Sequence, residues 1–133
     1  MPTNSILIID DDVDDVEILA DAFTQSGVQG VHYVHTAMQA FMYLESIADS
    51  TDLPKLIVTD YYLAGITGPQ FLADLKQMKR YQHIPVIVLS TTKTERQIEQ
   101  YKALGILEYI EKPSTYDEYL KVATEIKSRI NTK

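Results

Sequence analysis

A single carboxylate, Asp60, ends a short apolar run near the middle of the chain. The run, LIVT at residues 56–59, carries no charge and lies between turn-forming residues, which predicts a strand buried on both faces, as in a parallel sheet. In open α/β sheets, ligands bind outside the carboxyl ends of the strands. We therefore expect Asp60 to lie at the edge of the sheet where chemistry takes place.

Groups from three other segments are expected at the same edge. Asp10 and Asp11 follow the apolar run SILII, Ser90 ends the run PVIVLS, and Lys112 follows the run LEYIE. The carboxyl ends of parallel strands meet at one edge of a sheet, so these side chains should converge on Asp60 although they lie far apart in the chain.

The expected set of three carboxylates, a hydroxyl and a lysine points to phosphoryl transfer. Asp10, Asp11 and Asp60 cannot all remain comfortably ionised close together without a cation. Because they offer only oxygen ligands, they suit Mg²⁺, Mn²⁺ or Ca²⁺ and disfavour zinc. A carboxylate can act as a nucleophile and form an aspartyl-phosphate. Asp60 is thus the candidate nucleophile, with Lys112, Ser90 and the metal each holding one phosphoryl oxygen.

Apolar runs alternate with amphipathic segments in a pattern that predicts how these groups are positioned. The five expected strands are residues 5–10, 31–35, 56–59, 85–90 and 107–111, and the five expected helices are residues 11–26, 37–48, 69–79, 95–104 and 116–130. Strands that alternate with helices predict a parallel sheet with right-handed crossovers and helices on both faces. We expect a doubly wound α/β fold with the flavodoxin-like strand order 2-1-3-4-5, in which the first and third strands are neighbours.

Helical spacing also predicts which residues face the core. In the first two helices these are Val13, Val16, Leu19, Ala20, Phe23, Ala40, Phe41, Leu44, Ile47 and Ala48. In the third and last helices they are Phe71, Leu72, Leu75, Met78, Tyr116, Tyr119, Leu120, Ala123, Ile126 and Ile130. Gly27 and Gly105 are expected to end the first and fourth helices.

The composition is that of a globular protein with an excess of acidic residues. The 133 residues suit a single domain at 1–133, with a core at about 5–130 and no output domain, and 45% of them are apolar. The net charge of −7 argues against nucleic acid or an anionic membrane as the main partner. There are no cysteines, no apolar stretch near the ~20 residues of a membrane span and no signal peptide at residues 1–5, so we expect a cytoplasmic protein.

Four ordered motifs resemble those of response-regulator receiver domains of the chemotaxis-regulator type, which serve two-component signalling systems. They are IIDD at 8–11, TDYYLAGITG at 59–68, LST at 89–91 and YIEKP at 109–113, and the resemblance covers nearly the whole chain. It implies a signalling module rather than an enzyme, one that catalyses only its own phosphorylation and slow dephosphorylation.

The resemblance implies a role for each acidic residue of the motifs. Asp60 would be the phosphoacceptor, and Asp10 and Asp11 would be the acidic pair. The implied cofactor is Mg²⁺, bound directly by Asp11, by Asp60 and by the backbone carbonyl of Tyr62. Asp10 would act mainly through water.

The remaining motif residues are assigned by the same resemblance. Ser90 matches the switch hydroxyl, Tyr109 the switch aromatic residue and Lys112 the lysine that binds the phosphoryl group. When the phosphoryl group draws Ser90 toward it, Tyr109 would turn into the space that Ser90 leaves. The bond between Lys112 and Pro113 matches one that is usually cis in the family.

The loops around the expected site differ in detail from the family pattern. Leu63 and Ala64 stand where the family often has Met-Pro, so we expect a less rigid loop. Tyr62 and Thr92 match positions that tune the phosphoryl lifetime in receiver domains. Neither side chain is a carboxylate or amide well placed to orient water, and Tyr62 is bulky, so we predict slow loss of the phosphoryl group.

The partners are likewise implied by the resemblance. The phosphoryl donor would be a histidine kinase or a phosphotransfer protein, and a downstream protein of unknown identity would bind the face formed by residues 94–130. Tyrosine suits protein interfaces, so we expect Tyr101, Tyr109, Tyr116 and Tyr119 to lie on that face. We expect a monomer or weak dimer that binds neither nucleic acid nor membrane.

Three alternatives use these residues differently. Asp12, Asp14 and Asp15 are expected only to cap the helix that follows them and to complement its dipole. A Mg²⁺-dependent phosphohydrolase that forms an aspartyl-phosphate is the alternative function, but enzymes of the haloacid-dehalogenase type need a second Asp where this chain has Tyr62. A flavin-binding module would need a Ser/Thr/Gly-rich phosphate loop after the first strand, where this chain has acidic residues.

Overall fold

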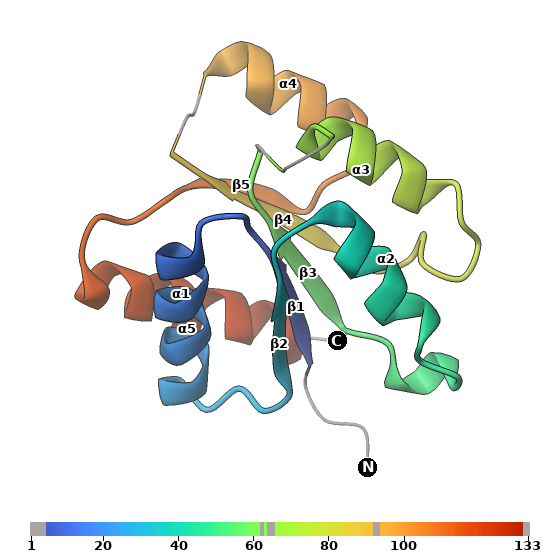
Figure 1. Cartoon of the computed structure of the whole chain (residues 1–133). Helices are drawn as coiled ribbons and strands as arrows, with labels where there is room; N and C mark the ends of the chain where they lie inside the picture. Colours follow the sequence, from blue (N-terminus) through green and yellow to red (C-terminus); the bar gives the residue numbers. More distant parts are fainter. Residues whose placement is uncertain (1–4, 62, 64–65, 92–93, 132–133) are drawn as a thin grey trace.

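A five-stranded parallel sheet forms the centre of the molecule (Figure 1). The computed structural model describes residues 5–61, 63, 66–91 and 94–131. The strands are β1 (Ile6–Ile9), β2 (Val31–Val34), β3 (Leu56–Thr59), β4 (Val86–Ser90) and β5 (Glu108–Glu111). Their order is β2-β1-β3-β4-β5, which confirms the predicted flavodoxin-like topology and makes β1 and β3 neighbours.

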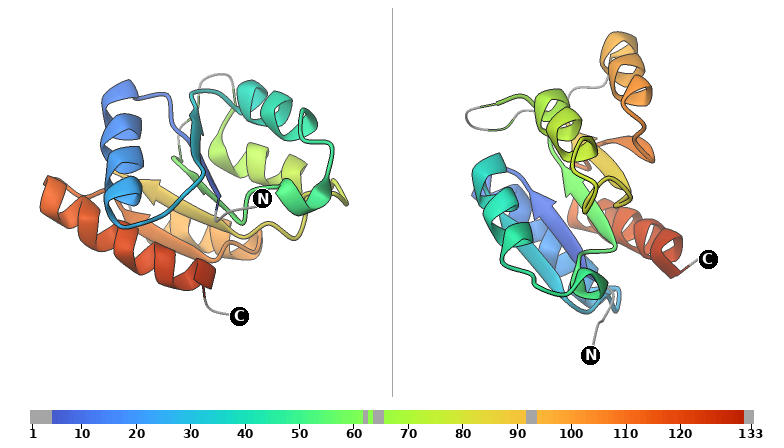
Figure 2. Two further views of the ribbon diagram at one scale, coloured as in Figure 1. Left: turned by 90° about the horizontal axis from the view of Figure 1, so that it is seen from below. Right: turned by 90° about the vertical axis from the view of Figure 1, so that its right-hand side faces the viewer.

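Helices cover both faces of this sheet. They are α1 (Val13–Gln25), α2 (Ala37–Glu45), α3 (Gly68–Lys76), α4 (Glu95–Ala103) and α5 (Tyr116–Asn131), with a single 3₁₀ turn, η1 (Ser50–Asp52), before β3. Helices α1 and α5 lie side by side on one face, and α2, α3 and α4 lie on the other (Figures 1 and 2). The five predicted helices are confirmed, each within a few residues of its expected bounds.

Two hydrophobic cores explain why the inner strands are apolar at almost every position. In β1, Leu7 and Ile9 face the core beneath α2, α3 and α4, whereas Ile6 and Ile8 face the core beneath α1 and α5. All four side chains are at most 1% exposed. A strand that is buried on both faces cannot alternate apolar with polar residues, so a continuous apolar run is the expected pattern.

Local sequence signals set the ends of the helices. The side chains of Asp12, Thr36 and Thr67 each accept a hydrogen bond from the backbone N–H three residues ahead, at the start of α1, α2 and α3. Gly27 and Gly105 follow α1 and α4 with φ values of +93° and +84°, a conformation that favours glycine. The predicted ends at these two glycines are confirmed.

Four predicted core residues lie at the surface instead. Val13 is 51% exposed because it begins α1, in front of the turns that pack on the sheet. Ala48 and Met78 are exposed because α2 and α3 end at Glu45 and Lys76, earlier than helical spacing indicated.

The fourth of these residues, Tyr116, begins α5 and is 42% exposed. Its hydroxyl donates a hydrogen bond of 2.6 Å to the Asp21 carboxylate on α1. The predicted surface of four tyrosines is wrong for the other three members. Tyr101 and Tyr109 are buried in the core on one side of the sheet, and Tyr119 is buried in the core on the other side.

Helix α4 is closely fitted to the loop that follows Asp60. A Cβ atom placed on Gly68 would lie 2.0 Å from the Tyr101 hydroxyl and 2.7 Å from the Tyr61 carbonyl oxygen. The Tyr101 ring also packs edge-on against those of Tyr61 and Tyr109, with centroids 5.4 and 5.6 Å apart. Gly68 is therefore required by space, because any side chain there would push α4 away from the sheet.

We predict that Gly68→Ala lowers the free energy of unfolding by about 2 kcal/mol, since an added methyl group overpacks this contact. Removing the hydroxyl from its partner, in Tyr101→Phe, should make room for part of that methyl group. The cost of Gly68→Ala, measured by urea unfolding, should therefore be smaller in the Tyr101→Phe background. An equal cost in the two backgrounds would show that the Tyr101 hydroxyl does not set the requirement for glycine.

Candidate functional site

The predicted site residues converge at the carboxyl edge of the sheet. Asp10 follows β1, Asp60 follows β3, Ser90 ends β4 and Lys112 follows β5. The backbone ladder fixes their spacing: the Asp60 N–H donates to the Ile9 carbonyl oxygen at 3.1 Å, and the Lys112 N–H donates to the Ser90 carbonyl oxygen at 2.7 Å. Four segments far apart in the sequence thus meet on rigid strand ends, as predicted.

Three carboxylates form a cluster that suits a hard divalent cation. One oxygen from each of Asp10, Asp11 and Asp60 lies within 4.8 Å of the others. Asp10 and Asp60 are buried, with 6% and 9% of their surfaces exposed, whereas Asp11 is open to solvent. Two buried oxygens and one exposed oxygen leave room for water around a bound ion, which is the arrangement that Mg²⁺ usually keeps. The donor set therefore fits the predicted metal.

The Lys112 ammonium lies among the carboxylates. Its Nζ is 2.8 Å from Asp10 Oδ2, 2.8 Å from Asp15 Oδ2 and 3.5 Å from Asp60 Oδ2. The lysine side chain is only 6% exposed, although it follows β5, which is three strand positions away from β1 and Asp10. The aliphatic part of the Lys112 side chain thus extends across the end of the sheet and places the ammonium group at the centre of the site.

Backbone and hydroxyl donors orient the two buried carboxylates. Asp10 Oδ1 accepts a 3.0 Å hydrogen bond from the Asp12 N–H, and Asp60 Oδ1 accepts one of 2.7 Å from the Tyr61 N–H. The Ser90 hydroxyl, which is fully buried, donates to the Asp60 carboxylate. In each carboxylate, Oδ1 therefore accepts a backbone hydrogen bond while Oδ2 faces Lys112.

Burial dominates the electrostatics of both carboxylates. Desolvation raises the pKa of Asp60, although the charge of Lys112 and the hydrogen bonds from Tyr61 and Ser90 act in the opposite direction. Desolvation likewise raises the pKa of Asp10, against the opposing hydrogen bond from Lys112. Both groups thus cost free energy when ionised without a cation, which is the condition that favours cation binding.

The neighbouring carboxylates stabilise the charged form of Lys112. Burial by itself would lower the pKa of Lys112, but the hydrogen bonds to Asp10 and Asp15 and the charges of Asp10 and Asp60 together raise that pKa. Lys112 is therefore a permanent cation at this edge of the sheet, available to bind an anionic oxygen.

Tyr109 is already buried in this structure. Its side chain is 8% exposed and packs against Tyr101 in the core beneath α4. The predicted inward turn of Tyr109 is therefore not needed to bring its ring under α4. The expected cis bond before Pro113 is wrong, because no peptide bond among the described residues is cis.

Some of the predicted positions lie outside the described residues. They are Tyr62, whose carbonyl was expected to bind the metal, and Ala64 and Thr92 in the adjoining loops. Leu63 is described, and it is buried in the core beneath α2, α3 and α4.

Asp15 is a member of the site that the sequence analysis missed. It was assigned to the first turn of α1, where it does lie, but its carboxylate also contacts Lys112, 97 residues further along the chain. The acidic residues between positions 10 and 15 indicate that a carboxylate could reach the site, but their spacing does not show which of them turns toward β5. The orientation of α1 over the sheet decides that Asp15, rather than Asp14, meets the lysine.

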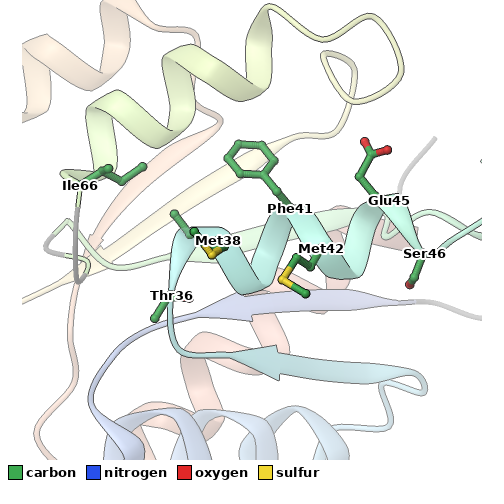
Figure 3. Close-up of a pocket in the computed structure, with 8 residues that line it drawn as sticks. Thr36, Met38, Phe41, Met42, Glu45, Ser46 and Ile66 are labelled. Carbon is green, nitrogen blue, oxygen red and sulfur yellow. The ribbon is translucent and has the colours of Figure 1, made fainter.

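A hollow of about 820 Å³ lies on α2, apart from this cluster (Figure 3). It is lined mainly by apolar side chains, including Met38, Phe41, Met42 and Ile66. Asp10, Asp11, Asp60, Ser90 and Lys112 do not line it. The cluster of charged groups at the end of the sheet is therefore separate from this apolar hollow.

Within the part of the chain that the structure describes, we find no helix with both the length and the apolar character that crossing a membrane would require.

Comparison with known proteins gives the same picture of the fold and identifies the family. The sequence matches the response regulator receiver domain family over residues 6–124. It is 30% identical over 113 residues to the two-component response regulator ORR12 of Oryza sativa subsp. japonica, a match that covers 85% of this chain and 89% of that protein.

Two solved structures illustrate the likeness in three dimensions. The phosphorylated cyanobacterial phytochrome response regulator RcpA superposes with a TM-score of 0.82 at 27% identity, covering 95% of this chain and 92% of that one. The Mn²⁺-bound form of response regulator Rcp1 gives a TM-score of 0.83 at 24% identity, covers 99% of this chain and 97% of that one, and shows the same fold. Because the family match includes every strand whose end carries a site residue, the chain belongs to the response regulator receiver domains of two-component signalling systems.

Proposed function

We propose that Asp60 accepts a phosphoryl group from a histidine kinase or a phosphotransfer protein, with Mg²⁺ bound beside it. The proposal rests on one observation above all: Asp60 Oδ2 lies in a buried cluster that combines two further carboxylates with the ammonium of Lys112. That combination supplies a nucleophile, ligands for a cation and a fixed positive charge at one point.

The residues of the site divide the work of the transfer. An Asp60 carboxylate oxygen attacks the phosphorus, a P–O bond forms, and the bond from phosphorus to the donor's histidine nitrogen breaks with its electron pair returning to that nitrogen. Lys112 and the Ser90 hydroxyl stabilise the negative charge on the phosphoryl oxygens. Mg²⁺, held by Asp11 and Asp60 with Asp10 nearby, would neutralise the carboxylates and bind a further phosphoryl oxygen.

The structural change caused by phosphorylation would spread from Ser90 to α4. Ser90 is hydrogen-bonded to Asp60 and pairs with Glu111 at the end of β5, two residues beyond Tyr109. Tyr109 packs on Tyr101, which anchors α4. A movement of the Ser90 hydroxyl toward a phosphoryl group would therefore disturb the packing that holds α4, which is how a local charge event biases a surface.

The surface available to a downstream protein differs from the one expected. Along residues 94–130 the exposed side chains are mostly polar or charged, with Leu107 at 45% exposure and Tyr116 at 42% as the large apolar exceptions among the described residues. We propose that α4, β5 and α5 still form the binding face, read through the position of α4 rather than through tyrosines at the surface.

Asp60 should be the residue that is labelled by a small phosphodonor. With Mg²⁺ and acetyl phosphate, wild type should gain one phosphoryl group, measured by intact mass, and Asp60→Asn should gain none because the nucleophile is gone. The matched control is Asp52→Asn, an exposed carboxylate in η1 before the same strand, which should label normally. Normal labelling of Asp60→Asn would refute the assignment.

Removing the Asp60 charge should stabilise the protein at neutral pH when no divalent cation is present. Burial raises the pKa of both Asp60 and Asp10, so their ionised forms destabilise the native state. We expect Asp60→Asn to raise the free energy of unfolding by about 1 kcal/mol, measured by urea unfolding in a chelator.

The pH dependence of this difference follows from the sign of the shift. As the pH falls through the raised native pKa toward 3.8, native Asp60 binds a proton before the unfolded chain does, so the wild type regains stability and the difference from Asp60→Asn should close. Added Mg²⁺ should stabilise wild type in a saturable way at neutral pH and Asp60→Asn much less. A wild-type melting temperature that does not respond to millimolar Mg²⁺ would count against the metal site.

The switch should be visible as a change that spreads from Ser90. Beryllofluoride, which stands in for the phosphoryl group on Asp60, should shift NMR signals across residues 94–119 in wild type. In Ser90→Ala the ligand should still bind, but the shifts should remain within the loops next to Asp60, because the hydroxyl that transmits the change is absent. Equally broad shifts in wild type and in Ser90→Ala would show that the signal leaves by another route.

A further inference from the structure

The proposed phosphoryl transfer to Asp60 does not itself require the contact between Lys112 and Asp15. Of the three carboxylates around the ammonium, Asp10 and Asp15 are both 2.8 Å away, whereas Asp60 is 3.5 Å away. An ammonium group has three N–H donors and forms its strongest hydrogen bonds at about 2.7–2.9 Å. In this state Lys112 is thus bound more closely to Asp15 than to the proposed phosphoacceptor.

Asp15 is held in place by its own helix. Its N–H donates a 3.1 Å hydrogen bond to the Asp12 side chain that caps α1, and the next residue, Val16, is fully buried against the sheet. The Asp15 side chain is 28% exposed, whereas that of Lys112 is 6% exposed. The ion pair therefore joins a fixed position on α1 to the end of β5, and its partial burial limits screening by solvent.

We propose that Asp15 is a positioning residue that retains Lys112 in the unphosphorylated protein and competes with the phosphoryl group for it. The inference rests on the proposed function of Asp60 and adds a control on it. A phosphoryl group on Asp60 brings anionic oxygens that need a hydrogen bond from the Lys112 ammonium. An N–H group of that ammonium that donates to Asp15 must then be shared with the phosphoryl oxygens or released from Asp15. The fourth carboxylate also adds negative charge beside the place where an anion must bind.

If Asp15 competes for Lys112, its removal should strengthen binding of a phosphoryl mimic, whereas removal of a residue that assists binding would weaken it. Removing the Asp15 charge should make Lys112 more available and should strengthen binding of a phosphoryl mimic. If Asp15 instead served to deliver Lys112 to the phosphoryl group, its removal would weaken that binding. If it only tethered α1 to β5, its removal would change the free energy of unfolding and leave binding unchanged.

The test measures beryllofluoride affinity at saturating Mg²⁺ in wild type, Asp15→Asn, Asp15→Glu and Asp14→Asn, by NMR titration. Asp14→Asn is the matched control, because it removes the same charge from the same turn of α1 at an exposed position for which no contact with Lys112 is found. We expect about fivefold tighter binding in Asp15→Asn, the size of effect that an ion pair of this kind supports. Asp14→Asn and the charge-retaining Asp15→Glu should stay close to wild type.

Several results would overturn the proposal. Unchanged or weaker binding in Asp15→Asn would do so, and so would equal strengthening in Asp14→Asn, which would show a general effect of net charge. Equal strengthening in Asp15→Glu would show that the carboxylate charge is not what retains the lysine.

A second measurement separates this proposal from the function of Asp60. A double-mutant cycle between Asp15→Asn and Lys112→Met, read by urea unfolding without metal or phosphodonor, should give a favourable coupling between the two side chains. No coupling would overturn the proposal, whatever Asp60 does. If coupling is present but wild type binds no beryllofluoride, then the function proposed for Asp60 has failed while the ion pair itself stands.

Discussion

The buried ammonium of Lys112 is the interaction on which the site depends. A lysine whose side chain is only 6% exposed would be costly by itself, and the two buried carboxylates beside a third would be costly without this lysine. Placed together, they compensate one another, and the hydrogen bonds from Asp12, Tyr61 and Ser90 complete the arrangement. One side chain from the end of β5 thereby ties together the ends of β1 and β3 and the first turn of α1.

The compensation is incomplete, and that imbalance suits the function. The site combines four carboxylates, those of Asp10, Asp11, Asp15 and Asp60, with a single ammonium, so the resting site carries an excess of negative charge. A divalent cation removes most of that excess, and the same cation and lysine can then accommodate the oxygens of a phosphoryl group. The metal-free fold is therefore less stable than it would be without this excess charge, but the same charge allows the site to bind a cation. Such local destabilisation is common where groups are arranged for chemistry.

In the proposed function, the packing around α4 would carry the consequence of that chemistry. The residue after Asp60, Tyr61, packs edge-on against Tyr101 of α4, and Tyr101 in turn packs against Tyr109 of β5. Gly68 leaves just enough space for the Tyr101 hydroxyl beside the loop that follows Asp60. Well-packed interiors do not deform continuously, so a small change at the phosphoacceptor is expected to shift α4 between discrete positions rather than to be absorbed locally.

Sequence patterns were enough to predict the strands, the order of the elements and the residues that meet at the carboxyl edge. Continuous apolar runs that end in Asp10, Asp60 and Ser90 are a local signal, and the alternation of strands and helices leaves few topologies. Local periodicity does not show which residues of different elements contact one another, and only the tertiary structure reveals those contacts. Asp15 contacts Lys112 because the packing of α1 on the sheet turns this side chain toward the end of β5. The tyrosines expected on one surface lie in two opposite cores, because Tyr101 and Tyr109 pack on the side of the sheet that α4 covers, whereas Tyr119 packs on the side that α5 covers. Spacing along the chain fixes which residues share a face of an element, but only packing between elements fixes what that face meets.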